Sequence, residues 1–548
     1  GLSATLGNLQ TAMDTLLWPV TATPPGHAPQ APPQLIQGQL PKALTIDSLI
    51  PDQFERFPWG GHLGIRHVER VAQEIDAAGT SLVFTNTRSQ AEIWYQALLD
   101  ARPDFAGQLA LHHGSLDKSV REWVEQGLKG GLLKAVVCTS SLDLGVDFLP
   151  VERVLQIGSP KGVARLLQRA GRSGHAPGRP SRITVVPTHA LELIEAAAAR
   201  QAAEQRQIEQ RHSPVQPLDV LVQHLVTIAV GGGFQPDALY QEVCTTWAYR
   251  NLPRSTFDWA LQFVVKGGDS LSAYPDYQRV AVLEDGSCKV LRRDIARRHV
   301  MSVGTILSDS SMHVAWVTGG RLGTIEEGFI ARLKTGDCFS FAGRVLELVR
   351  VKDMTAFVRK ASRKKATVPQ WQGGKMPLST ELSAASLAML GLAHKHLVCN
   401  TQPEQAELRA LMPLLTLQQH RSALPRPGVL LVEEMHSKEG HHLFVYPFQG
   451  RTVHIGLASL LAWRVSQHKP GTFSIAMNDY GFELLSAEPV NWQTWITPSA
   501  EKLFSDANLM QDIMGCLNAS ELAQRRFREI ARISGLIFQG FPGAGKSV

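Results

Sequence analysis

Strand-like and helix-like segments alternate along residues 62–205, and this alternation narrows the possible folds more than any other feature of the chain. Repeated alternation of this kind favours a parallel sheet with helices on both faces, which is an α/β fold. Ser115 is predicted to cap the second helix, with Asp117 in its first turn. The predicted strands are 81–87, 109–113, 134–139, 151–157 and 182–186, and the predicted helices are 89–99, 115–128, 162–170 and 190–203.

The chain on either side of this region has other patterns. Seven prolines fall between positions 19 and 41, so this stretch cannot be regular helix or central strand and is predicted to be a linker. After residue 205, three short helices, predicted at 217–228, 236–249 and 255–265, precede a hairpin signal at Asp285 and Gly286. This is the element order of a winged helix. From residue 300 onwards we expect antiparallel strands and helices in a mixed β-barrel and helical domain. The predicted domains are 1–20, 21–61, 62–205, 206–299 and 300–548.

Composition limits the class of protein. A chain of 548 residues predicts three or four domains at roughly 100–200 residues each. The net charge of +6 permits an anionic partner without proving one. Six scattered cysteines with no C-x-x-C pair exclude a zinc ribbon or a disulfide framework, and they favour a reducing cytosol, so we expect a cytoplasmic protein. No apolar run approaches the ~18 residues of a membrane-spanning helix. The first residue is Gly1 rather than Met, so we expect a fragment.

Polar residues follow the apolar strand at 134–139. Thr139 and Ser140 stand at its carboxyl end, where open α/β sheets collect ligands. Their hydroxyl groups could bind a phosphate of a nucleic-acid backbone. Asp147, after Gly145 in the same loop, is an acceptor suited to a ribose hydroxyl or an arginine. The sequence therefore predicts a nucleic-acid or nucleotide site at this edge of the sheet.

Two arginines lie three residues apart in the segment Gln-Arg-Ala-Gly-Arg-Ser-Gly-His at 168–175. On a helical turn, Arg169 and Arg172 point the same way. Guanidinium groups fit phosphate oxygens, and an arginine can stabilise the charge that develops in phosphoryl transfer. The alternative is a pair of ion-pairing arginines on the surface; the combination with the loop that ends at Asp147 favours phosphate contact.

These segments resemble motifs IV, V and VI of superfamily 2 helicases, in the order and spacing of the second RecA-like domain. Residues 3–5 are similar to motif III, which lies late in the first RecA-like domain. The phosphate-cradling Walker A loop and the Asp-Glu box that should precede Ser3 are absent from the sequence. The matching segments are 85–88, 113–115, 139–147 and 168–175.

Downstream segments narrow the resemblance to the large helicase-related (Lhr) family. The most similar branch is that of the ligase-associated DNA damage response DEXH-box helicases. The resemblance implies a 3′-to-5′ ATP-dependent DNA helicase that acts in DNA repair, needs ATP and Mg²⁺, and binds single-stranded DNA or a 3′-tailed duplex. It also implies an association with a DNA ligase, a nuclease and a phosphoesterase. The segments are 323–327, 334–337, 341–344, 371–379 and 440–448.

The family pattern implies roles for individual residues. Arg169 and Arg172, with Gln168, would be the catalytic group that contacts the ATP phosphates, and Gly145 and Asp147 would line the nucleotide site. Asn86, Arg88, Thr139 and Ser140 would contact the DNA strand, and Ser3 and Thr5 would couple the two RecA-like domains. His175 departs from the pattern, because many superfamily 2 members carry Arg at that position.

Two basic clusters outside the RecA-like domain are predicted to bind DNA, because basic side chains bind the phosphates of a strand and aromatic rings stack on its bases. Their alternative is a solvated charged face. Trp259, Tyr274 and Tyr277 could also stack on bases, but each is predicted to lie in the core, as large aromatic side chains usually do. The first cluster contains Arg292, Arg293, Arg297 and Arg298; the second contains Arg359, Lys360, Arg363, Lys364 and Lys365, followed by Trp371.

Two further patterns imitate functional sites. Residues 540–547 match the P-loop pattern up to Lys546 and Ser547, but no helix follows to bind phosphate, so we predict no nucleotide site there. The segment 433–442 is rich in Glu and His but lacks the spacing of a metal site, and it is predicted to be a polar turn with the start of a strand. Three alternatives to the helicase remain open: a non-catalytic DNA-binding module, an RNA-directed helicase, and an NTPase that uses Lys546.

Overall fold

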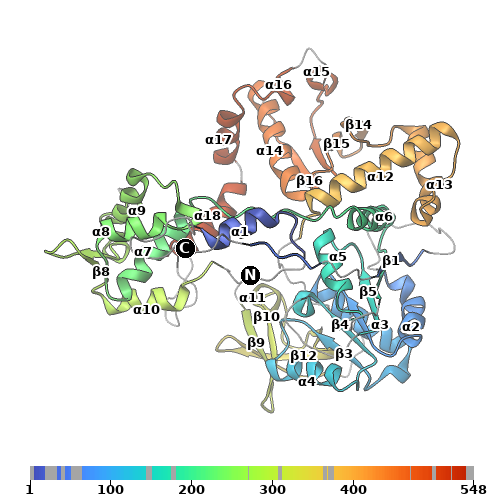
Figure 1. Ribbon diagram of the computed structural model, residues 1–548, viewed down its shortest axis with the longest axis horizontal. Helices are drawn as coiled ribbons and strands as arrows, with labels where there is room; N and C mark the ends of the chain where they lie inside the picture. Colours follow the sequence, from blue (N-terminus) through green and yellow to red (C-terminus); the bar gives the residue numbers. More distant parts are fainter. Residues whose placement is uncertain are drawn as a thin grey trace.

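The fold of the chain is given by a computed structural model (Figure 1). It describes residues 5–18, 34–38, 43–50, 64–143, 151–174, 180–268, 271–305, 311–361, 367, 376–469, 471–496, 501–519 and 521–537.

A six-stranded parallel sheet forms the centre of the part predicted to be α/β. Its strand order is β1-β6-β5-β2-β4-β3, and all neighbouring strands run parallel. Side chains alternate between the two faces, so that Leu82 and Val83 enter different cores. The RecA-like parallel sheet predicted from the alternation is confirmed. The strands are β1 (Leu44–Ser48), β2 (Ser81–Phe84), β3 (Leu109–His112), β4 (Ala135–Cys138), β5 (Arg153–Ile157) and β6 (Ser181–Val186).

Helices cover both faces of this sheet. Helices α2 (Val68–Asp76) and α3 (Arg88–Ala101) bury apolar residues on one face. On the other face lie α4 (Lys118–Lys129), α5 (Val163–Ala170) and α6 (Leu191–Glu204). The alanines at 196–199 of α6 are all buried. Such a small-residue helix can lie between two layers, and the second layer is part of the C-terminal region described below.

Two local predictions about this region are wrong. The stretch 21–61 is not wholly a linker, because Leu44–Ser48 pairs with β6 as an edge strand of the sheet. Ser115 does not cap α4; Asp117 does, accepting a hydrogen bond of 3.0 Å from the backbone N–H of Ser119. The hydroxyl of Ser115 instead accepts a hydrogen bond of 2.7 Å from Nη1 of Arg88.

The winged helix follows as predicted. Helices α7 (Leu218–Val230), α8 (Pro236–Cys244) and α9 (Arg254–Lys266) pack around a core that includes Leu225 and Phe257. The predicted second helix, 236–249, ends early, at Cys244, and a short 3₁₀ turn at Trp247–Tyr249 follows it. A hairpin of β7 (Ala281–Val282) and β8 (Cys288–Lys289) and then α10 (Arg293–Ser302) complete this lobe.

A five-stranded sheet comes next in the chain, with the order β10-β9-β13-β12-β11. All its neighbouring strands are antiparallel except β13 and β9. Among the described residues no pairing joins the edge strands β10 and β11, so the sheet is open where we expected a barrel. The strands are β9 (Ser311–Trp316), β10 (Arg321–Glu326), β11 (Cys338–Phe341), β12 (Arg344–Lys352) and β13 (Thr355–Lys360), and α11 (Glu327–Ile330) follows β10.

The C-terminal region pairs helices with a second antiparallel sheet of order β14-β15-β17-β16. Helix α12 (Thr380–Cys399) lies along α6 and shares its core through Leu382 and Met389 (Figure 1). This helix is long and apolar enough to cross a membrane by length and composition, so the expectation that no apolar run approaches that length was wrong. Its buried side chains pack against α6. The other elements are α13 (Ala406–Arg421), β14 (Leu431–Ser437), β15 (Gly440–Tyr446), α14 (Arg451–His468), β16 (Ser474–Met477), β17 (Phe482–Ser486), α15 (Gln493–Ile496), α16 (Glu501–Phe504), α17 (Leu509–Ala519) and α18 (Glu521–Ile533).

The five-stranded sheet is fastened to the RecA-like sheet domain by a buried carboxylate. Glu92 of α3 accepts hydrogen bonds from the backbone N–H groups of Ala342 (2.7 Å) and Gly343 (2.8 Å). The Nε2 atom of His113 lies 3.2 Å from the same carboxylate. Gly343 has φ +70°, and a Cβ there would lie 2.5 Å from the ring of Tyr95. The turn after β11 therefore fits closely against α3, and only Gly fits at position 343.

Replacing Glu92 with Ala should loosen this contact. The change leaves two half-buried N–H groups without their charged acceptor, which should cost about 2 kcal/mol. Hydrogen exchange of the amides in β11 and β12 should therefore become faster. Glu347→Ala is the matched control, because Glu347 pairs with the exposed Arg359 on the sheet itself, and it should leave those amides nearly unchanged. Equal rates in wild type and Glu92→Ala would show that the carboxylate does not hold the sheet.

Candidate functional site

The predicted site residues gather at one edge of the six-stranded sheet. Thr85 follows β2, Thr139 follows β4 and Ser159 follows β5, and these strands are parallel neighbours. The backbone N–H of Thr85 donates a hydrogen bond of 2.8 Å to the carbonyl of Cys138, so the two strand ends lie side by side. This is the carboxyl edge, where ligands bind in open α/β sheets.

Arg169 lies inside the protein rather than on an open surface. It is only 1% exposed. Its Nε lies 2.9 Å from Oδ1 of Asp143, and its Nη1 donates a hydrogen bond of 2.5 Å to Oε1 of Gln156. Its guanidinium also lies 4.7 Å from the ring centroid of Phe84. Because a buried cation needs such partners, Arg169 acts in this structure as an internal support of α5.

Asp143 is a site residue that the sequence reasoning missed. It lies at the end of the 3₁₀ turn Ser140–Leu142, directly after Thr139 and the end of β4, and it is 6% exposed. Arg165, one turn before Arg169 on α5, places its Nε 3.8 Å from the same carboxylate. Burial, and next the nearby Arg169 cation, lower the pKa of Arg165. The only signal in the sequence is an acidic residue between the strand end and Gly145.

Gln168 and Arg172 are placed differently from Arg169. Gln168 donates a hydrogen bond of 2.8 Å from Nε2 to the hydroxyl of Thr5, which joins α5 to the N-terminal segment. Arg172 lies just past the end of α5 and is half-buried. Its backbone N–H donates a hydrogen bond to the carbonyl of Arg169. The phosphate contact of Arg172 stays a prediction. Ser3, Gly145, Asp147, His175, the loop at Lys546 and Trp371 lie outside the described residues.

The residues predicted to touch DNA near this edge already have protein contacts. Asn86 donates a hydrogen bond of 2.6 Å to the carbonyl of Ser159. Arg88, bound to Ser115, has its pKa lowered by burial, which outweighs the opposite effect of Glu326. Thr139 is 7% exposed, whereas Ser140 is exposed. The structure brings all four residues to one edge, where Arg88 and Ser140 are the exposed ones.

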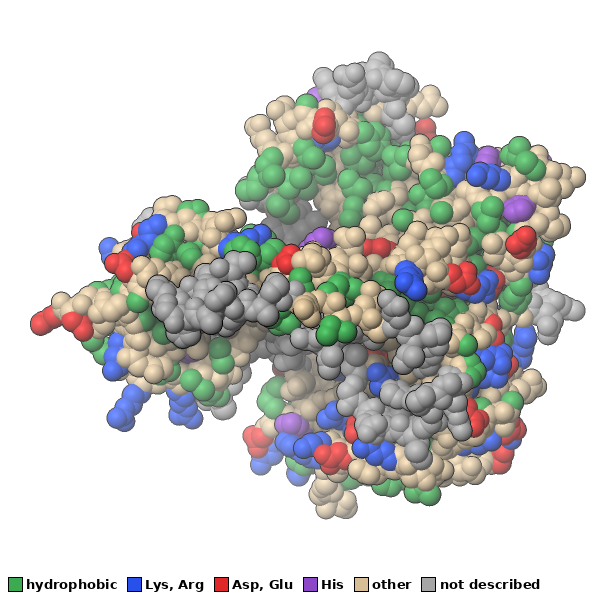
Figure 2. All heavy atoms as spheres, in the orientation of Figure 1, with side chains coloured by type: hydrophobic (Ala, Val, Ile, Leu, Met, Phe, Trp, Pro, Cys, Tyr) green, Lys and Arg blue, Asp and Glu red, His purple; other side chains and the backbone are tan. Residues whose placement is uncertain are grey.

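The first basic cluster divides into paired and open arginines. Arg292 binds Asp276 (3.0 Å) and Asp294 (2.6 Å), and these hydrogen bonds, that of Asp294 first, raise its pKa. Arg293 and Arg297 are exposed on one face of α10, and neither forms an ion pair with another of the described residues. Figure 2 shows Lys and Arg side chains projecting from the lobe that holds the winged helix. Arg293 is thus better placed for phosphate than Arg292.

Aromatic side chains lie near these arginines. Trp259 is 55% exposed and stacks on Phe263 at 5.5 Å between ring centroids, and Tyr274 is 58% exposed. Predicting these two rings as core was therefore wrong, because α9 and the turn before the hairpin turn them outward. Of the second cluster, Arg359 pairs with Glu347 at 2.6 Å and Lys360 is exposed. Residues 363–365 lie outside the described part of the chain.

The segment rich in Glu and His is a hairpin of β14 and β15. Its first half lies in β14 rather than in the predicted turn, and His441 and His442 lie at the start of β15, as predicted. Glu433 accepts hydrogen bonds from Gln418 and Tyr446, and His442 lies 2.5 Å from Glu483. Throughout the described residues, no group of three or more His, Cys, Asp or Glu side chains could hold a metal ion.

Three family models match the chain. They describe a helicase conserved C-terminal domain at residues 66–177, the winged helix domain of the large helicase-related protein at 201–368, and a DEAD/H-associated domain at 424–548. The second match extends beyond the winged helix into the five-stranded sheet, past the predicted boundary at 299.

Curated relatives match most of the chain. The "ATP-dependent helicase Lhr-Core protein 2" of Thermococcus barophilus is 31% identical over 492 residues, which are 88% of this chain and 56% of the relative. The "ATP-dependent helicase Lhr-Core" of Sulfolobus acidocaldarius is 28% identical, with 87% of this chain and 56% of the relative covered. The chain thus spans just over half the length of these relatives.

A solved structure has the same fold. The Mycobacterium smegmatis helicase Lhr bound to ssDNA and AMP-PNP superposes with a TM-score of 0.71 at 25% identity. The superposition covers 97% of this chain and 64% of the solved one.

Proposed function

We propose that this chain, which belongs to the large helicase-related (Lhr) family, is the C-terminal part of an ATP-dependent 3′-to-5′ DNA helicase that acts in DNA repair. The observation that carries the proposal is the hydrogen bond from Gln168 to Thr5. It holds Thr5, the last residue of the segment similar to motif III, against α5 at the ligand-binding edge of a RecA-like sheet. A nucleotide bound between two RecA-like domains would sit at that junction.

In this proposal Arg172 contacts the ATP phosphates, and Gly145 and Asp147 line the nucleotide. Arg169 supports α5 instead, because its guanidinium donates hydrogen bonds to Asp143 and Gln156. Transfer of the terminal phosphoryl group of ATP to water would supply the free energy for movement along the DNA. The described residues offer no cluster of three or more acidic, His or Cys side chains that could hold Mg²⁺. We therefore assign the Mg²⁺ ligands and the phosphate-cradling loop to a first RecA-like domain, and we expect this chain alone not to hydrolyse ATP.

We propose single-stranded DNA or a 3′-tailed duplex as the substrate. Ser140 at the sheet edge, Arg293 and Arg297 on α10, and Lys360 on the second sheet offer exposed groups for phosphate contact. The exposed rings of Trp259 and Tyr274 can stack on bases. The mycobacterial helicase Lhr, which has this fold, is bound to ssDNA in its solved structure. A cytoplasmic location and an association with a DNA ligase and a nuclease belong to the same proposal.

A second candidate function is a non-catalytic DNA-binding module. It is favoured by the grouping of exposed arginines and aromatic rings on the winged helix, because such a surface needs no nucleotide. An RNA-directed helicase is the third candidate function, because none of these residues distinguishes RNA, which has a 2′-hydroxyl, from DNA, which lacks it.

ATP hydrolysis stimulated by single-stranded DNA tests the proposal. This chain alone should show no turnover, and the chain joined to a first RecA-like domain should show turnover that DNA accelerates. Lys546→Ala should change neither result. Turnover by the chain alone that is lost in Lys546→Ala would place the nucleotide at residues 540–547 instead. A joined protein without turnover, whose DNA binding falls with salt and ignores ATP, would favour the binding module.

A further inference from the structure

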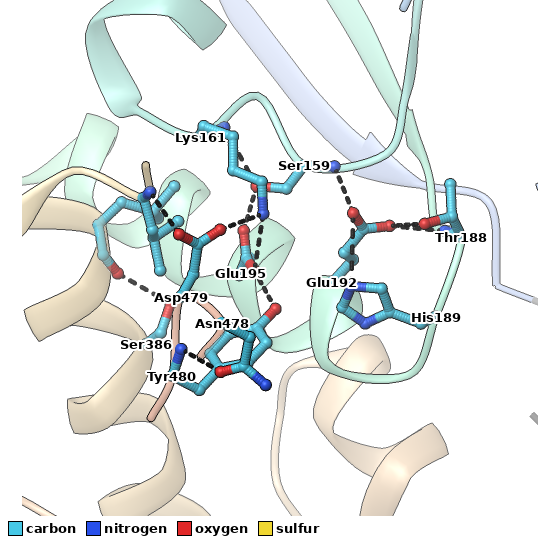
Figure 3. Close-up of polar contacts among 12 residues, drawn as sticks. Ser159, Lys161, Thr188, His189, Glu192, Glu195, Ser386, Asn478, Asp479 and Tyr480 are labelled. Atoms are coloured by element: carbon cyan, nitrogen blue, oxygen red, sulfur yellow. Dashed lines mark hydrogen bonds and ion pairs between the residues drawn. The ribbon is translucent and has the colours of Figure 1, made fainter. Parts of the chain in front are cut away.

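A buried polar network joins the RecA-like sheet domain to the C-terminal sheet (Figure 3). It centres on Lys161, in the loop between β5 and α5. The Nζ atom of Lys161 lies 3.0 Å from Oδ2 of Asp479 and 3.9 Å from Oε1 of Glu195. Asp479 stands in the turn between β16 and β17, whereas Glu195 belongs to α6. One cation thus bridges two carboxylates from different parts of the fold.

Neighbouring hydroxyl groups complete the network. Ser159, two residues before Lys161, and Tyr480, next to Asp479, both donate hydrogen bonds to the carboxylate of Glu195. The second oxygen of Asp479 accepts a hydrogen bond of 3.1 Å from the backbone N–H of Leu378. Glu195 is completely buried, and Asp479 and Tyr480 are each less than a tenth exposed. Water therefore competes little for these contacts, and each partner depends on the others.

The same contacts fix the beginning of α5. The backbone of Lys161 has φ +63°, and its carbonyl accepts a hydrogen bond of 2.9 Å from the N–H of Ser379, at the start of α12. The carboxylate of Glu209 accepts hydrogen bonds of 2.6 Å from both Val163 and Ala164, the first two residues of α5. Ser379 also donates its hydroxyl to Glu209 at 2.7 Å. The start of α5 is thus held directly by Glu209, and Ser379 of the C-terminal region contacts both Lys161 and Glu209.

Lys161 and Asp479 carry opposite charges that stabilise each other. Burial favours a neutral Lys161, but Glu195 and Asp479 outweigh it and raise the pKa of this amine. Burial would raise the pKa of the Asp479 carboxyl, but Lys161 outweighs that effect and lowers it. Both groups stay charged around neutral pH. Removing one charge leaves the other buried without a full partner, which is far more costly than losing an exposed pair.

We infer that Lys161 and Asp479 are positioning residues, through which the C-terminal sheet sets the orientation of α5 and of the arginines that α5 carries. The inference rests on the proposed function where it concerns ATP. Arg172 follows the last turn of α5, so a shift at Lys161 moves Arg172 relative to the phosphates. The side chain of Asn86 also donates a hydrogen bond to the carbonyl of Ser159, which lies in the loop of Lys161. The C-terminal sheet, a DNA-contact candidate and the arginines therefore meet at one loop.

The first test uses this chain and needs no ATP. Asp479→Asn should speed hydrogen exchange of the amides at the start of α5 by about tenfold or more, because a buried pair loses one charge. Glu407→Gln is the matched control. Glu407 is also buried and also ties the C-terminal region to α6, through two hydrogen bonds of 2.7 Å from Arg200, but it does not touch the loop of Lys161. The control should leave the α5 amides unchanged, and equal acceleration in both variants would overturn the inference.

The second test uses the helicase in which this chain is joined to a first RecA-like domain. Asp479→Asn should lower the kcat of DNA-stimulated ATP hydrolysis about tenfold, with the KM for ATP and the affinity for single-stranded DNA within about twofold. Asp479→Glu, which keeps the charge, should restore most of the kcat. Glu407→Gln should keep the wild-type kcat even if it lowers the melting temperature equally.

A kcat within twofold of wild type in Asp479→Asn, or an equal loss in Glu407→Gln, would overturn the inference. If Asp479→Asn does not fold, Tyr480→Phe removes only one hydroxyl from the network and should give a smaller loss of kcat in the same direction; an unchanged kcat there would overturn the inference. A wild-type helicase without DNA-stimulated turnover would reject the proposed function alone, because the exchange of α5 amides still tests the positioning.

Discussion

Replacing Arg172 with Ala is expected to lower the kcat of DNA-stimulated ATP hydrolysis by about 10³-fold, as the loss of an arginine on the transferred phosphoryl group does elsewhere. The measurement needs this chain joined to a first RecA-like domain. Arg172 is half-buried just after α5, beside a helix whose Gln168 already contacts the N-terminal segment. Its charge is thus placed to stabilise a transition state between two domains.

The matched control for this prediction is Arg182→Ala. Arg182 lies on β6, and its 44% exposed side chain pairs with Asp47 at 2.6 Å. Exposed pairs of this kind contribute little to stability, so the control should keep the wild-type kcat. Arg172→Ala should also keep the wild-type melting temperature and the affinity for single-stranded DNA within about twofold, because the charge is used in the transition state. A kcat within tenfold of wild type in Arg172→Ala would remove Arg172 from the phosphate site.

The sequence was sufficient to predict the sheet but not the different surroundings of the two arginines. Apolar strands and helices alternate along the chain, and residues such as Leu82 and Val83 lie on opposite faces of the sheet. Because this pattern involves residues close in sequence, it is sufficient to predict a parallel α/β fold. Arg169 and Arg172 share one local pattern. What separates them is Asp143, 26 residues before Arg169, which draws one guanidinium into the core. Local spacing contains no information about such a partner.

Contacts between distant parts of the chain were unpredictable for the same reason. Glu92 meets the backbone of Ala342 across 250 residues of sequence, and Tyr480 meets Glu195 across 285. In the sequence, Glu92 and Glu195 look like surface glutamates of amphipathic helices. Only the positions of the neighbouring sheets in the fold show that both are buried acceptors. The edge strand Leu44–Ser48 was hidden in another way, because the prolines before it favour a linker and only its pairing with β6 defines it.

The pair of Asp143 and Arg169 leads to the second large effect, which concerns stability. Asp143→Asn keeps the size of the side chain but removes the charge that faces the 1% exposed guanidinium of Arg169. A buried cation left without its counter-charge costs about 3–5 kcal/mol. Arg165, whose Nε is 3.8 Å from the same carboxylate, adds a second positive group to the unbalanced site. We therefore expect the RecA-like domain to lose about 3–5 kcal/mol of its free energy of unfolding.

Hydrogen exchange of the amides in β4 and β5 measures this loss for the RecA-like domain alone, because the amides of its central strands exchange only when the whole domain unfolds. The double variant Asp143→Asn with Arg169→Met tests the cause. If the penalty comes from an unpaired buried charge, removing that charge as well should recover part of the stability, so the double variant should be more stable than the sum of the single changes. Additive losses would mean that Asp143 supports the strand end through its backbone turn, and the assignment of Arg169 as a charge-paired support of α5 would then fail.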